Sequence, residues 1–445
     1  GVVDAADFFV VTLVRSPWDR MVSYYHWLQA QHFDHPAIGL ANSLDFSAFL
    51  NHPLTAASLR AQPYAPLILT PAIFGLVAWA TSRFVPQAAG SGIPQVIAAS
   101  RDPGLKLSAP LVSVRTALAK FGGTVAMLFA GASVGREGPT VQISAAIMVL
   151  MHKLFRVRLS AGVIIAGGAA GIAAAFNTPL AGIAFAIEEL AAAYEQRVAV
   201  LVMGAVMISG LVSLGIAGDY IYFGAVTGRL DVWAVIVLAP VAGFLGGWAG
   251  GLFSRLMLGF ADWQSPFAKR LKSRPVLLAL GCGIVVAVTG VMTGGATWGT
   301  GYETTRNLVE YGDTSIWYGP TKFLATLATS ISGVPGGIFA PSLSVGAGFG
   351  NFLKPLFPDQ PGSAIVLLGM VAYFVGVVRA PLTAVIILSE ATASRGMILP
   401  LFATALIADM AAKMVCRERL YHGLARRYFV KDEESEAKDK AVASG

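Results

Sequence analysis

The stretch Gly135-Arg136-Glu137-Gly138-Pro139 places an ionisable carboxylate between glycines within a long apolar region. A carboxylate inside a membrane segment is costly, so such residues are rare and usually functional. Two interpretations of Glu137 are open from this stretch alone. Either it is a functional group inside a membrane, or it is a buried glutamate with satisfied hydrogen bonds or part of a surface turn.

The composition favours a polytopic membrane protein. The chain has 445 residues, of which 55% are hydrophobic and only 13% are charged, and its mean hydropathy is +0.66. The 49 glycines suit closely packed transmembrane helices. Cys282 and Cys416 suggest neither a disulfide framework nor a metal site.

The net charge of +7 does not indicate a nucleic-acid partner here, because the basic residues gather in short loops and near the C-terminal end. A basic group follows the last apolar run and, by the positive-inside rule, predicts a cytosolic C-terminus. The group comprises Lys413, Arg417, Arg419, Arg426 and Arg427. Residues 431–445 carry mixed charges and are expected to form a disordered tail.

Residues 1–64 are polar and differ from the remainder of the chain. The run Phe8–Val14 predicts a buried strand and the residues through Leu28 a helix, so we expect a short soluble fragment of α/β type. The pattern Arg15-x-Pro17-x-x-Arg20-x-x-Ser23-x-Tyr25 resembles the 3′-phosphate-binding region of PAPS-dependent sulfotransferases. The resemblance implies Arg15 and Ser23 as vestigial phosphate ligands. The family's Gly-rich loop for the 5′-phosphate is absent, so we predict no sulfotransferase activity.

From Pro66 onward, apolar runs follow one another to Met414, and several are shorter than the roughly 20 residues that a full span requires. An internal repeat organises these runs. Five matches share an offset of 202 positions: Lys120-Phe121 with Lys322-Phe323, Gly135 with Gly337, Pro139 with Pro341, Pro179-Leu180 with Pro381-Leu382, and Glu188 with Glu390. We predict an all-α membrane domain over 65–430, with repeat halves at about 65–217 and 231–416.

The same offset raises a question about the N-terminal fragment. The apolar run Trp233–Met257 should have a counterpart at residues 31–55, which are polar, whereas Val276–Met292 finds an apolar counterpart at residues 74–90. We therefore expect residues 1–64 to replace a membrane segment, through a gene fusion or an assembly error. A separate soluble domain is the alternative, and an inactive fusion is a further possibility.

Three motifs join glycines to a proline at an expected helix start: residues 90–94, residues 135–139 and residues 336–341. Proline is favoured in the first turn of a helix, and glycine leaves backbone N–H groups accessible. Helix N-termini attract anions through these N–H groups and through the helix dipole. Broken helices whose ends meet at one place are typical of transporters built from repeats, and we expect the two halves to be inverted.

In this order, these motifs make residues 66–429 resemble the CLC family of chloride channels and chloride/proton antiporters. The resemblance implies that Ser91 and Tyr421 contribute hydroxyl groups, and Ile338 and Phe339 backbone N–H groups, to a chloride site. It implies that Glu137 is a gate that competes with chloride and carries protons. A homodimer in a bacterial-type plasma (inner) membrane is implied, with chloride and protons as the transported ligands and no cofactor, metal or nucleic acid.

Glu189 matches the internal proton-transfer glutamate of the family's antiporters. Its presence favours a chloride/proton antiporter over the alternative function, a passive voltage-gated-type chloride channel. A solvent-exposed glutamate at a helix end is the simpler interpretation of Glu189. Gly135, Arg136, Gly138 and Pro139 form the gate loop, in which Arg136 is expected to anchor the backbone. Lys120 lacks an evident acidic partner, because Gln95 and Ile97 stand where family members can carry glutamates.

Overall fold

The computed structural model describes residues 64–101, 108–190, 196–218, 221–226, 228–310 and 314–428. The chain divides into two compact units, Gly1–Leu69 and Thr70–Gly445, and the second unit contains nearly all of the described residues. The predicted N-terminal fragment, except its last residue, and the predicted tail lie outside the described residues. Arg15 and Ser23 therefore lie outside them too.

The first half contains both short and long helices, in the order α6 (Pro66–Phe84), α7 (Ile93–Arg101), α8 (Ser108–Leu111), α9 (Val114–Phe129), α10 (Glu137–Leu154), α11 (Ala161–Phe176), α12 (Pro179–Phe185), the π-helical turn η2 (Ala186–Leu190) and α13 (Gln196–Ala217). A 3₁₀ turn, η1 (Pro86–Ala88), follows α6.

The second half consists of α14 (Val232–Asp262), α15 (Pro266–Lys272), α16 (Pro275–Met292), α17 (Tyr302–Glu310), α18 (Tyr318–Ile331), α19 (Phe339–Leu353), α20 (Gly362–Val378), α21 (Pro381–Ala391) and α22 (Ile398–Val415), and its helices from α16 onward follow the order of the first half. Two 3₁₀ turns, η3 (Lys354–Leu356) and η4 (Arg395–Met397), flank α20 and α21, and residues 420–428 form a last helix.

Six of the described helical segments are long and apolar enough to cross a membrane: Pro66–Phe84, Ala109–Phe129, Val198–Ile216, Val232–Asp262, Pro275–Met292 and Ile398–Val415. The helices α11, α20 and α21 are apolar but shorter. Large apolar side chains are exposed on the long helices, such as Ile216 on α13 and Val232 on α14. In water such surfaces would be unfavourable, whereas a lipid bilayer solvates them, and the protein is an integral multi-pass membrane protein as predicted.

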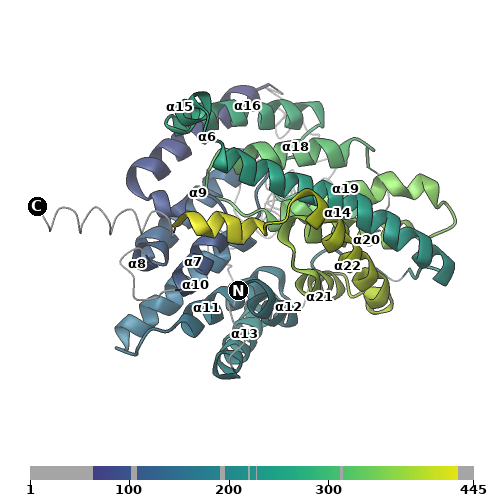
Figure 1. Cartoon of the computed structure of the whole chain (residues 1–445), viewed down its shortest axis with the longest axis horizontal. Coiled ribbons are helices and arrows are strands. Elements are labelled where there is room, and N and C mark those ends of the chain that lie inside the picture. The colour runs from purple at the N-terminus through teal and green to yellow at the C-terminus, as the bar shows by residue number, and fades with distance from the viewer. Residues whose placement is uncertain are drawn as a thin grey trace, which may run out of the picture. The chain divides into compact units, whose positions relative to one another are not determined.

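The long helix α14 packs along α20 and α22 through a stripe of glycines (Figure 1). A methyl group on Gly247 would lie 2.4 Å from the backbone oxygen of Ala408, and one on Gly250 would lie 2.5 Å from the backbone oxygen of Tyr373. Small residues let helix backbones approach closely where lipid offers no hydrophobic driving force. The abundance of glycine therefore serves helix packing.

The two halves are pseudo-symmetric, as the offset of 202 predicts. Gly135 and Gly337 form an isolated antiparallel bridge and exchange both backbone hydrogen bonds, at 2.7 and 2.8 Å. Asn177 and Arg379 end α11 and α20 in the same left-handed conformation, with φ of 56° and 65°. Equivalent residues that contact each other in this reciprocal way lie beside a two-fold axis between the halves.

The helices α12 and α21 meet at this axis, and each receives a carboxylate from the other half (Figure 1). Glu188, just after α12, accepts hydrogen bonds from the N–H of Leu382 at 3.2 Å and from the N–H and hydroxyl of Thr383, both at 2.8 Å. Glu390, in α21, accepts one from the N–H of Ala181 at 3.2 Å. A carboxylate at a helix N-terminus binds N–H groups that have no partner within the helix.

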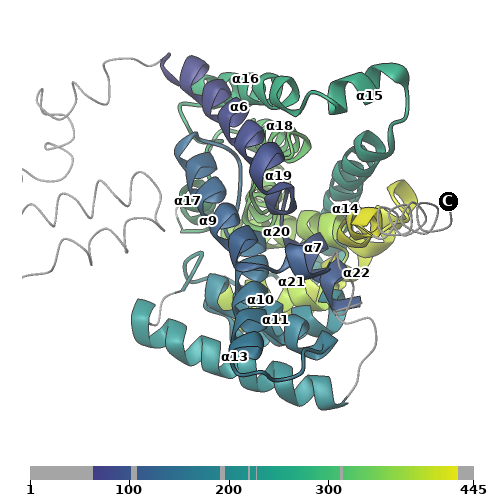
Figure 2. The same ribbon diagram turned by 90° about the vertical axis from the view of Figure 1, so that its left-hand side faces the viewer.

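One part of the predicted repeat is wrong. The apolar counterpart of α16 is α6, at an offset of 209 rather than 202, and α17 corresponds to α7 at the same offset. The reason is a longer connection in the first half: 30 positions separate Gly90 from Lys120, but only 23 separate Gly299 from Lys322. Figure 2 shows the paired helices α6 and α16 crossing each other, where Gly283 approaches Pro71.

Candidate functional site

Three helix starts lie against one another, as the three glycine-proline motifs predict. The helices α7, α10 and α19 begin at Ile93, Glu137 and Phe339, and each carries its proline in the first turn. Gly90 donates its N–H to the carbonyl of Gly333 at 3.2 Å, and Gly336 donates to the carbonyl of Gly90 at 3.1 Å. Together with the bridge between Gly135 and Gly337, these bonds tie the three loops into one unit.

Glycine is required where the loops are closest. A methyl group on Gly138 would lie 2.5 Å from Ser91 Oγ, 2.8 Å from the Ser91 carbonyl oxygen and 3.2 Å from Gly337 Cα. Gly92 has a φ of +107°, which side chains other than hydrogen rarely allow. The backbones of α7 and α10 therefore meet with Ser91 between them.

Two hydroxyl groups converge at this place. Ser91 Oγ and Tyr421 Oη are buried, and neither has a hydrogen-bond partner among the described residues. The Tyr421 phenol lies beside Ser91 and within electrostatic reach of both Glu137 and Glu189. Burying a hydroxyl without a partner is unfavourable. An anion between the two residues would accept a hydrogen bond from each.

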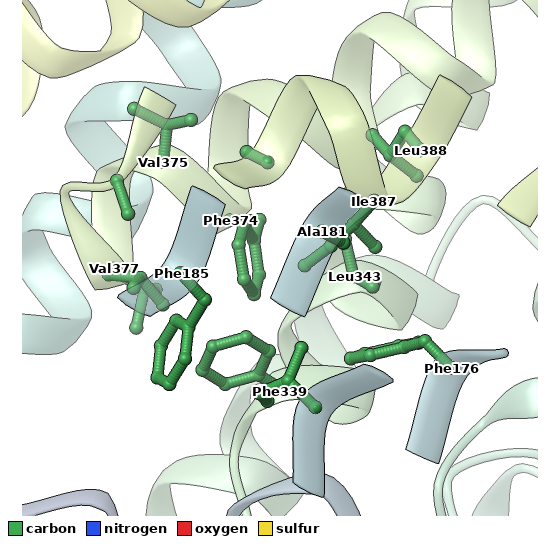
Figure 3. Close-up of a cluster of buried hydrophobic side chains, with 14 of the residues drawn as sticks. Phe176, Ala181, Phe185, Phe339, Leu343, Phe374, Val375, Val377, Ile387 and Leu388 are labelled. Atoms are coloured by element: carbon green, nitrogen blue, oxygen red, sulfur yellow. The ribbon is translucent and has the colours of Figure 1, made fainter. Parts of the chain in front are cut away.

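The start of α19 is held in a dry, aromatic environment (Figure 3). The Phe339 ring meets Phe374 and Phe185 edge to face, with centroids 4.8 and 5.6 Å apart, and it stacks on Tyr421 at 6.0 Å. Phe176 approaches from another side, with its ring centroid 6.2 Å from that of Phe339. The N–H groups at the start of a helix have no acceptor within the helix. Excluding water around Ile338 and Phe339 strengthens the attraction of these N–H groups for an anion.

Glu137 lies against the same helix start. Its side chain is completely buried, and Oε2 accepts a long hydrogen bond, 3.4 Å, from the N–H of Ala340. The guanidinium of Arg136 and the phenol of Tyr222 lie near this carboxylate. The carboxyl group of Glu137 thus occupies a position at the N-terminus of α19 where the helix dipole favours an anion.

Arg136 connects residues 135–139 to neighbouring elements. Its guanidinium donates to the carbonyl of Ala175 at 3.3 Å and lies 5.5 Å above the ring of Tyr222. Sequence reasoning did not identify Tyr222. It lies in the connection between the two halves, and nothing near it in the sequence resembles the three glycine-proline motifs.

Glu189 is not a solvent-exposed glutamate at a helix end, and that simpler interpretation is wrong. Its side chain is 0% exposed and lies in the π-helical turn η2. His422 Nδ1 lies 3.2 Å from Glu189 Oε1, although the two groups are not aligned as a hydrogen bond. The adjacent carboxylate of Glu188 binds the start of α21 instead, so the two neighbouring carboxylates contact different parts of the protein.

The two intramembrane lysines find backbone carbonyls as partners. Lys120 Nζ donates to Gly90 at 2.8 Å and to Ala89 at 3.4 Å. Gln95, at a position where family members can carry glutamate, donates to the same Ala89 carbonyl at 2.6 Å. Lys120 therefore secures the loop that presents Ser91, and its missing acidic partner is not needed for that role.

Lys322 is the counterpart of Lys120 and donates to the carbonyls of Thr297 and Gly299, at 2.9 and 2.8 Å. In the described part of the chain, no three His, Cys, Asp or Glu side chains gather as metal ligands would. Cys282 and Cys416 are both free. The chemical groups of the site are hydroxyls, backbone N–H groups and carboxylates.

Two pseudo-symmetric halves whose broken helices meet at a buried polar site define a membrane transport protein. The chain belongs to the voltage gated chloride channel family, whose model matches residues 73–413. The predicted family is thereby confirmed.

Curated relatives agree. The H(+)/Cl(-) exchange transporter ClcA of Yersinia pseudotuberculosis serotype IB (strain PB1/+) is 30% identical over 458 residues, covering 97% of this chain and 88% of the relative. This alignment therefore extends into residues 1–64. The protein of the same description from Vibrio vulnificus (strain YJ016) is 31% identical over 392 residues, covering 83% of this chain and 80% of the relative.

Solved structures have the same fold. A slow cyanobacterial Cl-/H+ antiporter aligns with a TM-score of 0.72 at 25% identity, covering 93% of each chain. A CLC-type fluoride/proton antiporter aligns with a TM-score of 0.69 at 21% identity, covering 84% of this chain and 91% of the other. The second likeness is one of fold alone.

Proposed function

We propose that this protein exchanges chloride for protons across a membrane. The observation that carries the proposal is the position of Glu137, whose carboxylate accepts the Ala340 N–H at the start of α19. A carboxylate and a chloride ion are both monovalent anions, so the same N–H groups can hold either one. The descriptions of the relatives as H(+)/Cl(-) exchange transporters support the same function.

In this mechanism chloride binds between Ser91 Oγ, Tyr421 Oη and the backbone N–H groups of Ile338 and Phe339. These donors are neutral, so they hold the ion without the strong attraction of a full positive charge, and the ion can leave. Protonation of Glu137 removes its charge and its affinity for the start of α19. Chloride entry and protonation of Glu137 are then coupled, because the ionised carboxylate and chloride compete.

Glu189 is proposed to pass protons between the other side of the membrane and Glu137. A buried carboxylate is an unfavourable place for a lasting charge, which suits a group that gains and loses a proton during each cycle. A passive chloride channel has no use for such a group. The burial of Glu189 therefore favours the exchanger over the channel.

We further propose that the halves are inverted in the membrane, that the C-terminus is cytosolic and that the protein forms a homodimer in a bacterial-type plasma membrane. Inverted repeats with a central site are the common plan of secondary transporters. The basic residues beyond α22 support the cytosolic end.

The test is flux through purified protein in liposomes, with chloride and proton movements recorded together. An outward chloride gradient should drive protons against their own gradient in the wild type. Glu137→Ala should let chloride pass without moving protons, and Glu189→Gln should also abolish proton movement. Glu418→Gln is the control for Glu189, since its carboxylate is 41% exposed, pairs with Arg426 at 3.6 Å and should not be needed for coupling. Wild-type chloride flux without proton movement would establish a channel instead.

A further inference from the structure

His422 is the one described imidazole in contact with a buried carboxylate of the site. The other described histidine, His152, lies at the end of α10 and contacts the Met148 carbonyl. His422 directly follows Tyr421, which is proposed to bind chloride, and both residues belong to the last helix, residues 420–428. The function proposed above assigns no role to His422.

A proton path from solvent to Glu189 requires an exposed group beside the buried carboxylate, and His422 and Glu189 differ in this way. The His422 side chain is 29% exposed, whereas that of Glu189 is 0% exposed. Solvent protons can therefore reach His422 but have no direct access to Glu189. The 3.2 Å between His422 Nδ1 and Glu189 Oε1 is within the distance range of a hydrogen bond.

Imidazole is suited to this position because it has two nitrogens and changes charge in the physiological pH range. We propose that His422 is the solvent-facing proton relay of Glu189, an inference that rests on the chloride/proton exchange proposed above.

The transfer balances without any further reactant. A solvent proton binds one ring nitrogen and gives an imidazolium ion. The Nδ1–H bond then breaks as an O–H bond forms on Glu189 Oε1, which leaves a neutral imidazole and a neutral carboxylic acid. The ring is left with its proton on the other nitrogen. Exchange with solvent while the partly exposed ring is turned away from Glu189, in which Nε2 loses a proton and Nδ1 gains one, returns the ring to its starting tautomer, and the reverse sequence returns the proton from Glu189 to solvent.

Among the described residues, the carboxylate in contact with His422 is that of Glu189. Several other charged groups on the last helix and around it have contacts of their own. Arg419 donates to the Glu188 carbonyl, and Glu188 itself binds α21. Glu418 pairs with Arg426, and Asp262 of α14 pairs with Arg427.

The test compares full-length His422→Gln and His422→Ala with wild type in liposomes, at several internal pH values. Glutamine has a similar size and polarity but cannot take up and release a proton in this pH range, and alanine has no polar side chain. Both variants should therefore slow coupled exchange by about tenfold or more, which is less than the rate factor that a proton-transfer group usually contributes. Imidazole in the buffer should restore exchange in His422→Ala, whose missing ring leaves room for it, but not in His422→Gln. His152→Gln is the control and should exchange like wild type.

The outcomes separate the relay from the exchange itself. If wild type exchanges and both His422 variants match it at every pH, the relay is refuted and the exchange function stands. A different result is that both variants are slow, have the wild-type pH profile and are not accelerated by imidazole. His422 is then structural, and the relay is again refuted. If wild type moves no protons, the proposed function fails and the relay fails with it.

Discussion

Replacing Gly138 by alanine tests the geometry of the chloride site with a single methyl group. The added Cβ would lie 2.5 Å from Ser91 Oγ and 2.8 Å from the Ser91 carbonyl oxygen. Both distances are well below an ordinary van der Waals contact. The hydroxyl can rotate away, but the carbonyl belongs to the backbone at the start of α7. The two helix starts must therefore separate, and Ser91 must change its orientation.

The size of the effect follows from two contributions. Overpacking of a close contact costs about 1–3 kcal/mol of stability. A hydrogen bond to a charged partner contributes about 1.5–3 kcal/mol, and each 1.4 kcal/mol changes an affinity about tenfold. Loss of the Ser91 donor should therefore weaken chloride binding by roughly 10- to 150-fold.

Isothermal titration of chloride into the purified protein in detergent, with thermal unfolding of the same samples, measures both contributions. Gly122→Ala is the matched control, because a Cβ at Gly122 in α9 meets nothing within 4 Å. Gly122→Ala should leave chloride affinity unchanged and should raise the stability by at most about 1 kcal/mol, because alanine is the better helix former. Unchanged affinity in a destabilised Gly138→Ala would refute Ser91 as a chloride ligand. Unchanged affinity together with unchanged stability would refute the tight approach of α7 and α10.

Three other substitutions have distinct expected results. Glu188→Ala should lower the midpoint of thermal unfolding more than Glu390→Ala, since Glu188 accepts three hydrogen bonds at the start of α21. Each charge-assisted bond contributes about 1.5–3 kcal/mol. A lower midpoint for Glu390→Ala than for Glu188→Ala would contradict this reasoning. Lys322→Met should cost roughly 3 kcal/mol, seen as a lower unfolding midpoint, because two buried carbonyls lose their donor. Tyr421→Phe should weaken chloride binding about tenfold in titration. Thermal stability should not fall, because the buried hydroxyl has no hydrogen-bond partner in the described part of the protein. A large drop in stability would show that the phenol is structural.

Much of the site was predictable from sequence because both halves need the same residue at the same contact. Gly135 and Gly337 bond to each other across the two-fold axis, and a Cβ on either would press on the loop around it: on Gly135 it would meet the Glu137 carboxylate, and on Gly337 it would lie 2.9 Å from the Gly138 nitrogen. The starts of α7, α10 and α19 follow from proline and glycine chemistry that acts within a few residues. Local rules of this kind can be applied to a single sequence.

Contacts between distant parts of the chain were not predictable in this way. His422 and Glu189 are far apart in the sequence, and no spacing rule links an imidazole on the last helix to a carboxylate in η2. Nothing in the sequence indicates the carbonyl partners of Lys120, because every residue carries a backbone carbonyl. The offset of 209 does have a signal in the sequence: Gly299-Thr300-Gly301 repeats the Gly90-Ser91-Gly92 pattern ahead of α17.

The reciprocal contacts across the two-fold axis also bear on how the chain could be assembled. Glu188 and Glu390 each fasten the opposite half, and the exchanged bonds of Gly135 and Gly337 fix the alignment of the halves. None of these bonds depends on the peptide connection between α13 and α14. Two polypeptides made separately and divided at that connection thus carry complementary surfaces that specify their own pairing, in the manner of a split protein.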